Sequence, residues 1–137
     1  MTIGRLLREK NKKIASAESC TGGLLADRLT DVSGSSAYFL AGIVSYSNQA
    51  KVNLLGVSPE VLKRYGAVSA LCAKQMAAGI RRVANTDIGI STTGISGPTG
   101  DTPWKPLGLV YIGYADNDIC IAQKFVFIIC SSYIKHG

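Results

Sequence analysis

Apolar and polar positions alternate between a helical and a strand period along the first part of this 137-residue chain. Ile3, Leu6 and Leu7 share one face of a short helix, which we expect to end near Lys13. The apolar stretch 14–18 then predicts a brief buried strand. Helical spacing returns from Thr21 to about Asp31. The chain therefore begins with a helix, a strand and a second helix.

The longest apolar run of the first half is YFLAGIVSY, residues 38–46. Because it is apolar and partly β-branched, it predicts a central strand. Ser47 or Asn48 then caps a helix that Gly56 closes. Pro59 stands in the first turn of a further short helix, a position that tolerates its missing N–H group.

The clearest helical pattern of the chain begins after Ser69. Cys72, Met76, Ile80 and Val83 recur on one face, with charged positions outside it. We interpret this apolar face as part of the core and not as a binding surface.

The last third of the chain predicts three strands, at 88–92, 107–114 and 119–129. The polar turn at 116–118 indicates that the last two form a hairpin. Helices and strands are thus mixed, and the final strands are adjacent in sequence. This order predicts an α/β fold, a three-layer α/β/α sandwich with a mixed β-sheet.

Composition fits one globular domain over residues 1–137. Hydrophobic residues make up 47% of the chain and charged residues 18%, with no linker, repeat or low-complexity tract. The first 13 residues are too charged for a signal peptide. The apolar run 125–130 is far too short to cross a bilayer. We therefore expect a cytoplasmic protein with no membrane partner.

Cysteine and histidine usage limits the possible chemistry. The four cysteines show no paired or regular spacing, which indicates reduced thiols and no disulfide framework; they are Cys20, Cys72, Cys120 and Cys130. Because the one histidine is His136, a histidine-rich metal site is excluded and a Ser-His-Asp triad is disfavoured. We expect neither a metal nor a cofactor.

The net charge of +6 is partly concentrated in residues 5–13. Nucleic-acid binding is one interpretation of such a basic segment. We prefer a solvated surface, because no aromatic residues interleave with these charges to stack on bases. The same positive field would attract a small anionic substrate.

Polar and glycine-rich clusters follow three of the predicted strands, at 18–23, 46–51 and 93–98. Open α/β sheets place their sites in loops at the ends of strands, so the three clusters converge if these ends share one edge. Ser19 would then be a nucleophile at the start of a helix, where N–H groups and the dipole favour developing oxyanions. The alternative is that Ser19 or Thr21 is only a helix cap.

A lysine is the candidate base, because no histidine is at hand. Lys51 would lie in the first turn of its helix, where the dipole disfavours a cation, and burial would lower its pKa further. Tyr46 could relay a proton or orient Ser19. The alternatives are an exposed helical lysine and a strand-end aromatic whose hydroxyl contacts water.

The remaining candidates belong to binding. The loop 94–100 would let main-chain N–H groups approach a phosphate or an oxyanion, although Gly-x-x-Gly-Pro by itself also simply marks a loop. Asn48 could bond a substrate amide or cap a helix. Cys20 is a competing nucleophile, but nothing nearby in the sequence would activate its thiol.

Several segments in fixed order resemble the C-terminal domain of the competence/damage-inducible protein CinA family. They are AESCTGG, LTDVSGSSAYFLAGIVSYSNQAKVNLLGV, GAVS, TGISGP and KPLGLVYIG, and they run from about residue 14 to about 114. Members of this family include stand-alone nicotinamide-nucleotide amidases. The resemblance implies an α/β/α fold and hydrolysis of the carboxamide of nicotinamide mononucleotide, giving nicotinate mononucleotide and ammonia.

The resemblance also implies roles for individual residues in a Ser/Lys amidohydrolase of pyridine nucleotide metabolism. Matching the motifs gives Ser19, Lys51 and Tyr46 as catalytic residues. The substrate-binding residues that we predict are Thr21, Gly22, Asn48, Thr93, Gly94 and Gly97. The expected partners are a small nucleotide substrate and further copies of the chain in a homo-oligomer.

The chain departs from the family's pattern in three places. Its last residues show neither the Gly-Asp-Arg segment nor the closing helix that family members usually have, so we expect the domain to lack that C-terminal helix. Gln49 stands where glutamate is common, which favours a lower pKa for Lys51. Trp104 stands where a small or acidic residue is common. One alternative is therefore a catalytically impaired nucleotide-binding protein, and another is an oligomeric partner protein.

Overall fold

The computed structural model describes residues 2–95 and 105–127, which form a five-stranded mixed sheet. The strand order is β2-β1-β3-β4-β5. β1 pairs in parallel with β2 and β3, whereas β3–β4 and β4–β5 are antiparallel. The strands are β1 (Ile14–Glu18), β2 (Phe39–Val44), β3 (Ile88–Gly94), β4 (Leu109–Ala115) and β5 (Cys120–Val126).

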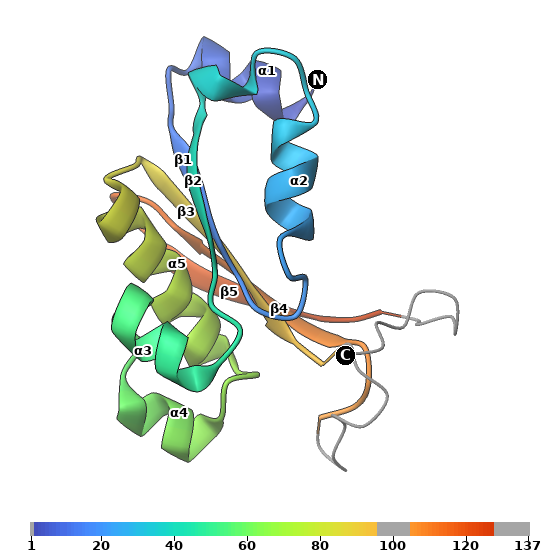
Figure 1. The fold of residues 1–137 in the computed structure, drawn as a ribbon, viewed down its shortest axis with the longest axis vertical. Coiled ribbons are helices and arrows are strands. Elements are labelled where there is room, and N and C mark those ends of the chain that lie inside the picture. Colours follow the sequence, from blue (N-terminus) through green and yellow to red (C-terminus); the bar gives the residue numbers. More distant parts are fainter. Residues whose placement is uncertain (1, 96–104, 128–137) are drawn as a thin grey trace.

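Helices cover both faces of this sheet, so the predicted three-layer α/β arrangement is confirmed (Figure 1). One layer holds α1 (Ile3–Glu9) and α2 (Leu24–Thr30), with the short 3₁₀ turn η1 (Ser35–Ala37). The other layer holds α3 (Asn48–Leu55), α4 (Pro59–Tyr65) and α5 (Ala70–Ala84).

Glycines allow α5 to lie directly on the sheet. A Cβ atom at Gly89 of β3 would stand 2.1 Å from the Ala77 carbonyl oxygen, and one at Gly113 of β4 would stand 2.3 Å from that of Ala73. Both carbonyls belong to α5, so the helix backbone touches the strand backbones with no side chain between them. Gly79 does the same for α3, because its Cβ would lie 2.1 Å from the carbonyl oxygen of Leu55.

The core is divided by the sheet into two clusters. The larger one lies on the α5 face and consists of Ala15, Ala17, Leu55, Val57, Cys72, Met76 and Ile80. The smaller one lies under α1 and is made by Leu7, Ile14 and Tyr38. β1 contributes to both, because alternate residues of a strand point to opposite faces.

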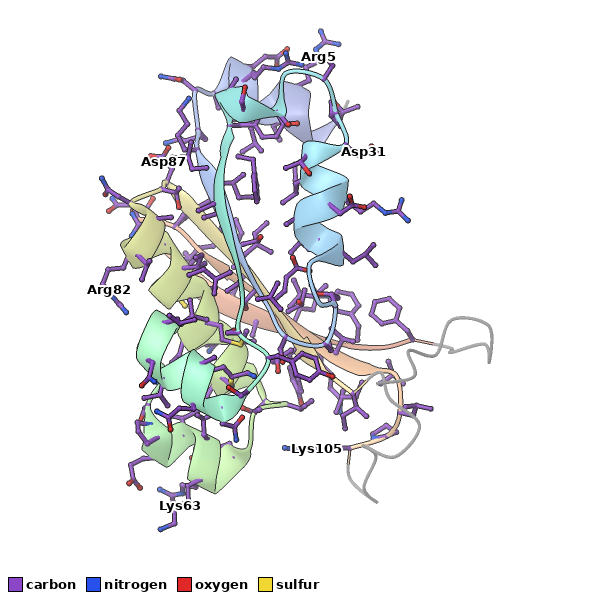
Figure 2. The ribbon with its side chains drawn as sticks, viewed as in Figure 1. Arg5, Asp31, Lys63, Arg82, Asp87 and Lys105 are labelled. Carbon is purple, nitrogen blue, oxygen red and sulfur yellow. The ribbon has the colours of Figure 1, made fainter. Side chains whose placement is uncertain are left out.

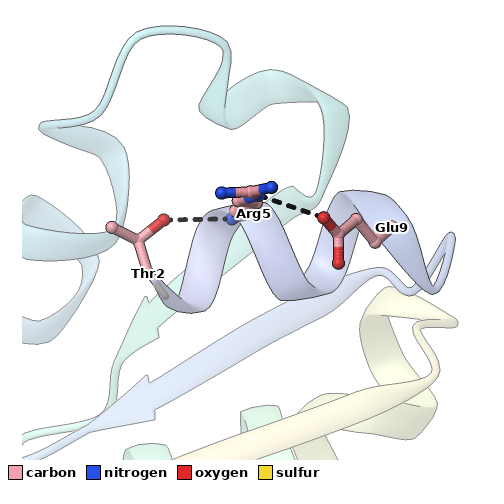
Figure 3. Close-up of polar contacts among 3 residues, drawn as sticks. All are labelled: Thr2, Arg5 and Glu9. Carbon is pink, nitrogen blue, oxygen red and sulfur yellow. Dashed lines mark hydrogen bonds and ion pairs between the residues drawn. The ribbon is translucent and has the colours of Figure 1, made fainter.

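The first helix has a well-defined start. Thr2 is the N-cap, and its hydroxyl accepts a hydrogen bond from the Arg5 N–H at 3.3 Å (Figure 3). Arg5 Nε also donates to Glu9 at 3.0 Å in an exposed i,i+4 ion pair. The helix ends at Glu9 and not near Lys13 as predicted, because Asn11 adopts a left-handed conformation with φ of 52°.

Two further predictions about the core were wrong. β2 is an edge strand and not a central one, and alternate residues such as Leu40 and Val44 remain about half exposed on it. Val83 of α5 is exposed, because the buried face of that helix follows Cys72, Met76 and Ile80 and leaves Val83 outside. Continuous hydrophobicity alone did not distinguish an edge strand from a central one.

The ends of several elements also differ from the prediction. α2 begins at Leu24 and not at Thr21, because Gly22 and Gly23 have positive φ and form a turn before it. β3 continues to Gly94. The predicted hairpin between β4 and β5 is confirmed, with the Asp116 carboxylate accepting from the N–H groups of Asp118 and Ile119. The last three residues predicted for β5, from Phe127 on, lie beyond its end or outside the described residues.

We predict that Gly79→Ala lowers the free energy of unfolding by about 2 kcal/mol, because the new methyl group would force α3 away from α5. This loss exceeds the gain of about 1 kcal/mol that alanine brings as a better helix former. Urea unfolding measures the free energy of unfolding of the variant and of the wild type. Val83→Ala on the exposed side of the same helix is the control and should change stability by less than about 0.5 kcal/mol. An unchanged or stabilised Gly79→Ala protein would contradict the close packing.

Candidate functional site

The carboxyl ends of β1, β2 and β3 meet at one edge of the sheet, because the three strands are mutually parallel. Main-chain hydrogen bonds continue past the strand ends. The Ser19 N–H donates to the Thr92 carbonyl at 3.0 Å, and the Ser45 N–H donates to the Glu18 carbonyl at 2.8 Å. The segment that follows β1 therefore lies between the segment that follows β2 and the end of β3.

Ser19 and Lys51 are in direct contact at this edge. Lys51 Nζ lies 3.1 Å from Ser19 Oγ. The same nitrogen is 2.9 Å from the Ser45 carbonyl oxygen and 3.0 Å from that of Tyr46. The Lys51 side chain, which comes from the first turns of α3, is 1% exposed, and Ser19 is 8% exposed. The two residues that sequence analysis paired are therefore brought together in a buried place.

The three contacts of Lys51 Nζ fit either protonation state. A neutral amine has two N–H donors and one lone pair. Carbonyl oxygens can only accept, so the carbonyls of Ser45 and Tyr46 take both donors and leave the lone pair for the Ser19 hydroxyl. An ammonium has three donors, and the same three oxygens accept them. A proton can therefore pass between Ser19 and Lys51 without a rearrangement of the heavy atoms.

Burial lowers the pKa of Lys51 from its ordinary value of 10.5, because the ammonium loses its hydration. The thiols of Cys72 and Cys20 act in the opposite direction, since their thiolates would favour the cation. Burial also raises the pKa of Cys72 to about 11, so this thiol stays protonated near neutral pH. Within the described ranges the one ion pair is Arg5–Glu9, and no carboxylate pairs with Lys51.

Tyr46 contributes its main chain to this centre. Its side chain is 71% exposed, and among the described residues its hydroxyl has no hydrogen-bond partner. The phenol is therefore not joined to Ser19 or Lys51 in this structure, as a proton relay would require. What Tyr46 supplies to Lys51 is a carbonyl oxygen.

The N-terminus of α2 is already occupied by a carboxylate. Glu18 is 1% exposed, and its side chain accepts hydrogen bonds from the N–H groups of Leu25 at 2.7 Å and Ala26 at 3.0 Å. We expected the start of this helix to favour a developing oxyanion, and a carboxylate of the protein itself accepts from its N–H groups instead. Glu18 was not among the predicted site residues, although an acidic residue shortly before a helix start is a recognisable signal for such a cap.

Thr21 and Gly22 shape the turn between Ser19 and α2. The Thr21 hydroxyl lies 2.5 Å from Glu18 Oε1 and 2.8 Å from Thr92 Oγ1. The N–H of Gly22 donates to the Ser19 carbonyl at 3.1 Å, and its φ of 59° suits glycine. Both predicted binding residues therefore lie in the Ser19 turn, and Gly22 is exposed there.

The other predicted binding residues are placed less directly. Asn48 is the exposed first residue of α3, and Ser47 is the cap, since its hydroxyl accepts from the Ala50 N–H at 3.0 Å. Thr93 is buried and donates its hydroxyl to the Ala67 carbonyl at 2.8 Å.

Gly94 is the last residue of β3, and a Cβ there would lie 2.5 Å from the Leu109 carbonyl oxygen. The absence of a side chain at Gly94 therefore allows β4 to pack closely against β3. Gly97 lies outside the described residues.

Other kinds of site receive little support from the part of the chain that the structure describes. No group of three His, Cys, Asp or Glu side chains there could hold a metal ion. Cys20, Cys72 and Cys120 form no disulfide within the described part of the chain, and Cys130 is not among the described residues. None of the described helices is both long and apolar enough to cross a lipid bilayer.

Comparison with known proteins identifies the family to which the chain belongs. The model of the family described as "CinA C-terminal domain" matches residues 1–133. The chain belongs to the CinA C-terminal domain family.

Relatives agree with this assignment. A putative competence-damage inducible protein of Thermoanaerobacter sp. strain X514 is 55% identical over 124 residues, which are 90% of this chain and 30% of that protein. A CinA-like protein of Sulfurihydrogenibium sp. strain YO3AOP1 is 57% identical over 125 residues, 91% of this chain and 31% of that protein. This CinA domain thus spans about a third of the length of these relatives.

Solved structures share its fold. The competence damage-inducible protein A (ComA) from Klebsiella pneumoniae superposes with a TM-score of 0.88 at 33% identity, over 92% of this chain and 78% of that one. The competence/damage inducible protein CihA from Agrobacterium tumefaciens gives 0.87 at 38% identity, over 90% and 76%.

We predict that Lys51 makes the stability of the CinA domain depend on pH between its lowered pKa and 10.5. In that window the unfolded chain binds more protons at this residue than the folded one, so stability rises with pH. The free energy of unfolding of the wild type should therefore increase relative to that of Lys51→Met as pH rises. The increase amounts to about 1.4 kcal/mol for each unit by which the pKa is lowered.

Urea unfolding at pH 6 to 10.5 measures this difference. Lys63→Met is the matched control, because Lys63 lies exposed on the outer side of α4 and points away from the sheet (Figure 2). The control should differ from the wild type by a constant amount across the range. A constant difference for Lys51→Met as well would mean that burial does not disfavour its ammonium.

Proposed function

We propose that this CinA domain is an amidohydrolase that uses Ser19 and Lys51 to cleave the carboxamide of nicotinamide mononucleotide. The products are nicotinate mononucleotide and ammonia. The observation that carries the proposal is the 3.1 Å contact between Ser19 Oγ and Lys51 Nζ. The lysine in this contact is almost fully buried and has no carboxylate partner among the described residues. The substrate comes from the resemblance to nicotinamide-nucleotide amidases.

The first half of the reaction forms an acyl-enzyme. Neutral Lys51 takes the proton of the Ser19 hydroxyl, and Ser19 Oγ bonds to the carboxamide carbon. The tetrahedral intermediate then breaks its C–N bond. The proton now on Lys51 goes to the departing nitrogen, which leaves as ammonia, and the acyl group stays on Ser19 as an ester.

The second half restores the enzyme. A water molecule attacks the ester carbon while Lys51 takes one of its protons. The C–O bond to Ser19 breaks, and Lys51 returns that proton to Ser19 Oγ. The acid is released and Lys51 is again neutral. The carbonyls of Ser45 and Tyr46 hold the amine in place throughout, because they accept its N–H groups in every state.

The oxyanion of the intermediate needs N–H donors, each typically worth ~3 kcal/mol. The first turn of α2 does not supply them, since Leu25 and Ala26 already donate to Glu18. The same argument removes this helix start as a site for the substrate phosphate. We keep the segment 94–100 as the proposed phosphate site; most of it lies outside the described residues.

Tyr46 has two separate parts at this site: its carbonyl contacts Lys51, and its phenol is exposed. We propose that its ring contacts the bound substrate, and that its part in holding the base belongs to its main chain. The homo-oligomer and the cytoplasmic location stay predictions.

We predict that Ser19→Ala and Lys51→Ala each lower kcat for ammonia release from nicotinamide mononucleotide by at least about a thousandfold. The double variant should lose no more than either single one, because nucleophile and base act as a unit. Ser36→Ala and Lys63→Ala are controls at exposed positions away from the dyad and should keep wild-type rates.

Calorimetric titration of nicotinamide mononucleotide separates this proposal from binding without turnover. A wild type that binds the nucleotide and releases no ammonia would favour the non-catalytic alternative. Full activity in both single variants would exclude the Ser/Lys mechanism.

A further inference from the structure

Glu18 is buried next to the nucleophile, and its carboxylate is held entirely by neutral donors. Oε1 accepts from the Thr21 hydroxyl at 2.5 Å and from the Leu25 N–H at 2.7 Å, and Oε2 accepts from the Ala26 N–H at 3.0 Å. No cation forms an ion pair with it among the described residues. The N-terminal end of α2 therefore supplies the positive field that keeps this charge inside the protein.

The main chain of Glu18 connects both members of the dyad. Ser19 is its covalent neighbour on one side. Its carbonyl accepts from the Ser45 N–H at 2.8 Å and from the Ser45 hydroxyl at 3.3 Å. The carbonyl of Ser45 in turn accepts from Lys51 Nζ. One residue thus links the backbone of the nucleophile to the backbone that holds the base.

A second link runs through Thr21. Its hydroxyl contacts both the Glu18 carboxylate and Thr92 Oγ1 at 2.8 Å, and the Thr92 carbonyl accepts from the Ser19 N–H. The Ser19 turn is therefore tied to α2 through Glu18 and to β3 through Thr92. A shift of the carboxylate would loosen the turn on which Ser19 Oγ is carried.

We infer that Glu18 is a positioning residue, whose carboxylate fixes the turn so that Ser19 Oγ meets Lys51 Nζ. This inference rests on the proposed function, since it concerns the same dyad. Glu18 touches neither reacting atom. Its effect passes through the turn 19–23 and through Ser45.

Two substitutions disturb the carboxylate with little change of volume. Glu18→Gln replaces one acceptor oxygen by an NH₂ group, which would face an N–H of α2 and leave a buried donor unpaired. Thr21→Val removes the hydroxyl that reaches Glu18 and Thr92, and Thr21→Ser keeps that hydroxyl. Glu60→Gln, on the exposed side of α4, is the matched control for the loss of a carboxylate.

The experiment uses a fluorophosphonate, so it does not depend on the amide substrate. Ser19 Oγ bonds to phosphorus, the P–F bond breaks, fluoride leaves, and the Ser19 proton passes to Lys51. Intact-mass spectrometry follows the rate of labelling from pH 6 to 10, and Ser19→Ala gives the background. Thermal unfolding shows that each variant is folded.

We expect the labelling rate of the wild type to rise with pH to a plateau as Lys51 loses its proton. In Glu18→Gln and Thr21→Val the plateau should fall at least tenfold. The midpoint should not move, because the substitutions leave unchanged the causes that set the Lys51 pKa, which are its burial and, less strongly, the thiols of Cys72 and Cys20. Thr21→Ser should recover most of the rate, and Glu60→Gln should match the wild type.

Wild-type plateaus in both Glu18→Gln and Thr21→Val would overturn the inference. A shifted midpoint at an unchanged plateau would overturn it too, because Glu18 would then act through its charge. If Glu18→Gln does not fold, the comparison of Thr21→Val with Thr21→Ser decides, and equal losses in both count against positioning. A wild type labelled no faster than Ser19→Ala would instead refute the Ser/Lys dyad of the proposed function, and the inference with it.

Discussion

The arrangement of this domain depends on one buried amine. Lys51 has lost nearly all contact with water, and its nitrogen is surrounded by two main-chain carbonyls and the Ser19 hydroxyl. An ammonium would be costly in such a place without a carboxylate, and an amine is not. The site therefore gives up some stability and holds a lysine whose pKa burial lowers below its ordinary value, which makes the neutral amine easier to form. That exchange is the physical basis of the catalytic role proposed here.

The fold supplies the conditions for this contact from three directions. Parallel pairing brings the ends of β1, β2 and β3 to one edge. The glycine contacts of α5 let that helix lie on the sheet and let α3 lie on α5, which places Lys51 over the end of β1. Glu18 accepts from N–H groups at the start of α2, so hydrogen bonds within the protein fix the turn that carries Ser19. Each device uses backbone groups, and few side chains are needed at the centre.

For the pairing of Ser19 with Lys51, the residue pattern left a helix cap and an exposed lysine open, and the resemblance to the CinA family favoured the pair. The sequence was sufficient for the element order. Short apolar strands followed by polar clusters place those clusters at strand ends, and parallel strands share one edge. It was not sufficient for β2, whose apolar run predicts a central strand although it lies at an edge with Leu40 and Val44 half exposed. Whether a strand gains a second neighbour depends on pairing between distant segments, which local hydrophobicity does not record.

Some details of the candidate site could not be predicted from the pattern of residues in the sequence. The phenol of Tyr46 was predicted to act on Ser19, yet it is the Tyr46 carbonyl that contacts the base. Every residue has a main-chain carbonyl, so a sequence motif cannot show which carbonyl accepts a hydrogen bond from Lys51. Glu18 had a signal, an acidic residue before a helix, but its role depends on where α2 begins. The positive φ of Gly22 and Gly23 moves that start to Leu24.

The charge state of Lys51 is the claim on which the account rests, and it can be observed directly. NMR titration of the protein with ¹⁵N-labelled lysine side chains, assigned with Lys51→Met, follows each nitrogen from pH 5 to 11. The account predicts that the Lys51 signal changes to that of a neutral amine at a lower pH than the signals of the exposed lysines. A Lys51 nitrogen that stays an ammonium until it titrates together with the exposed lysines would contradict it.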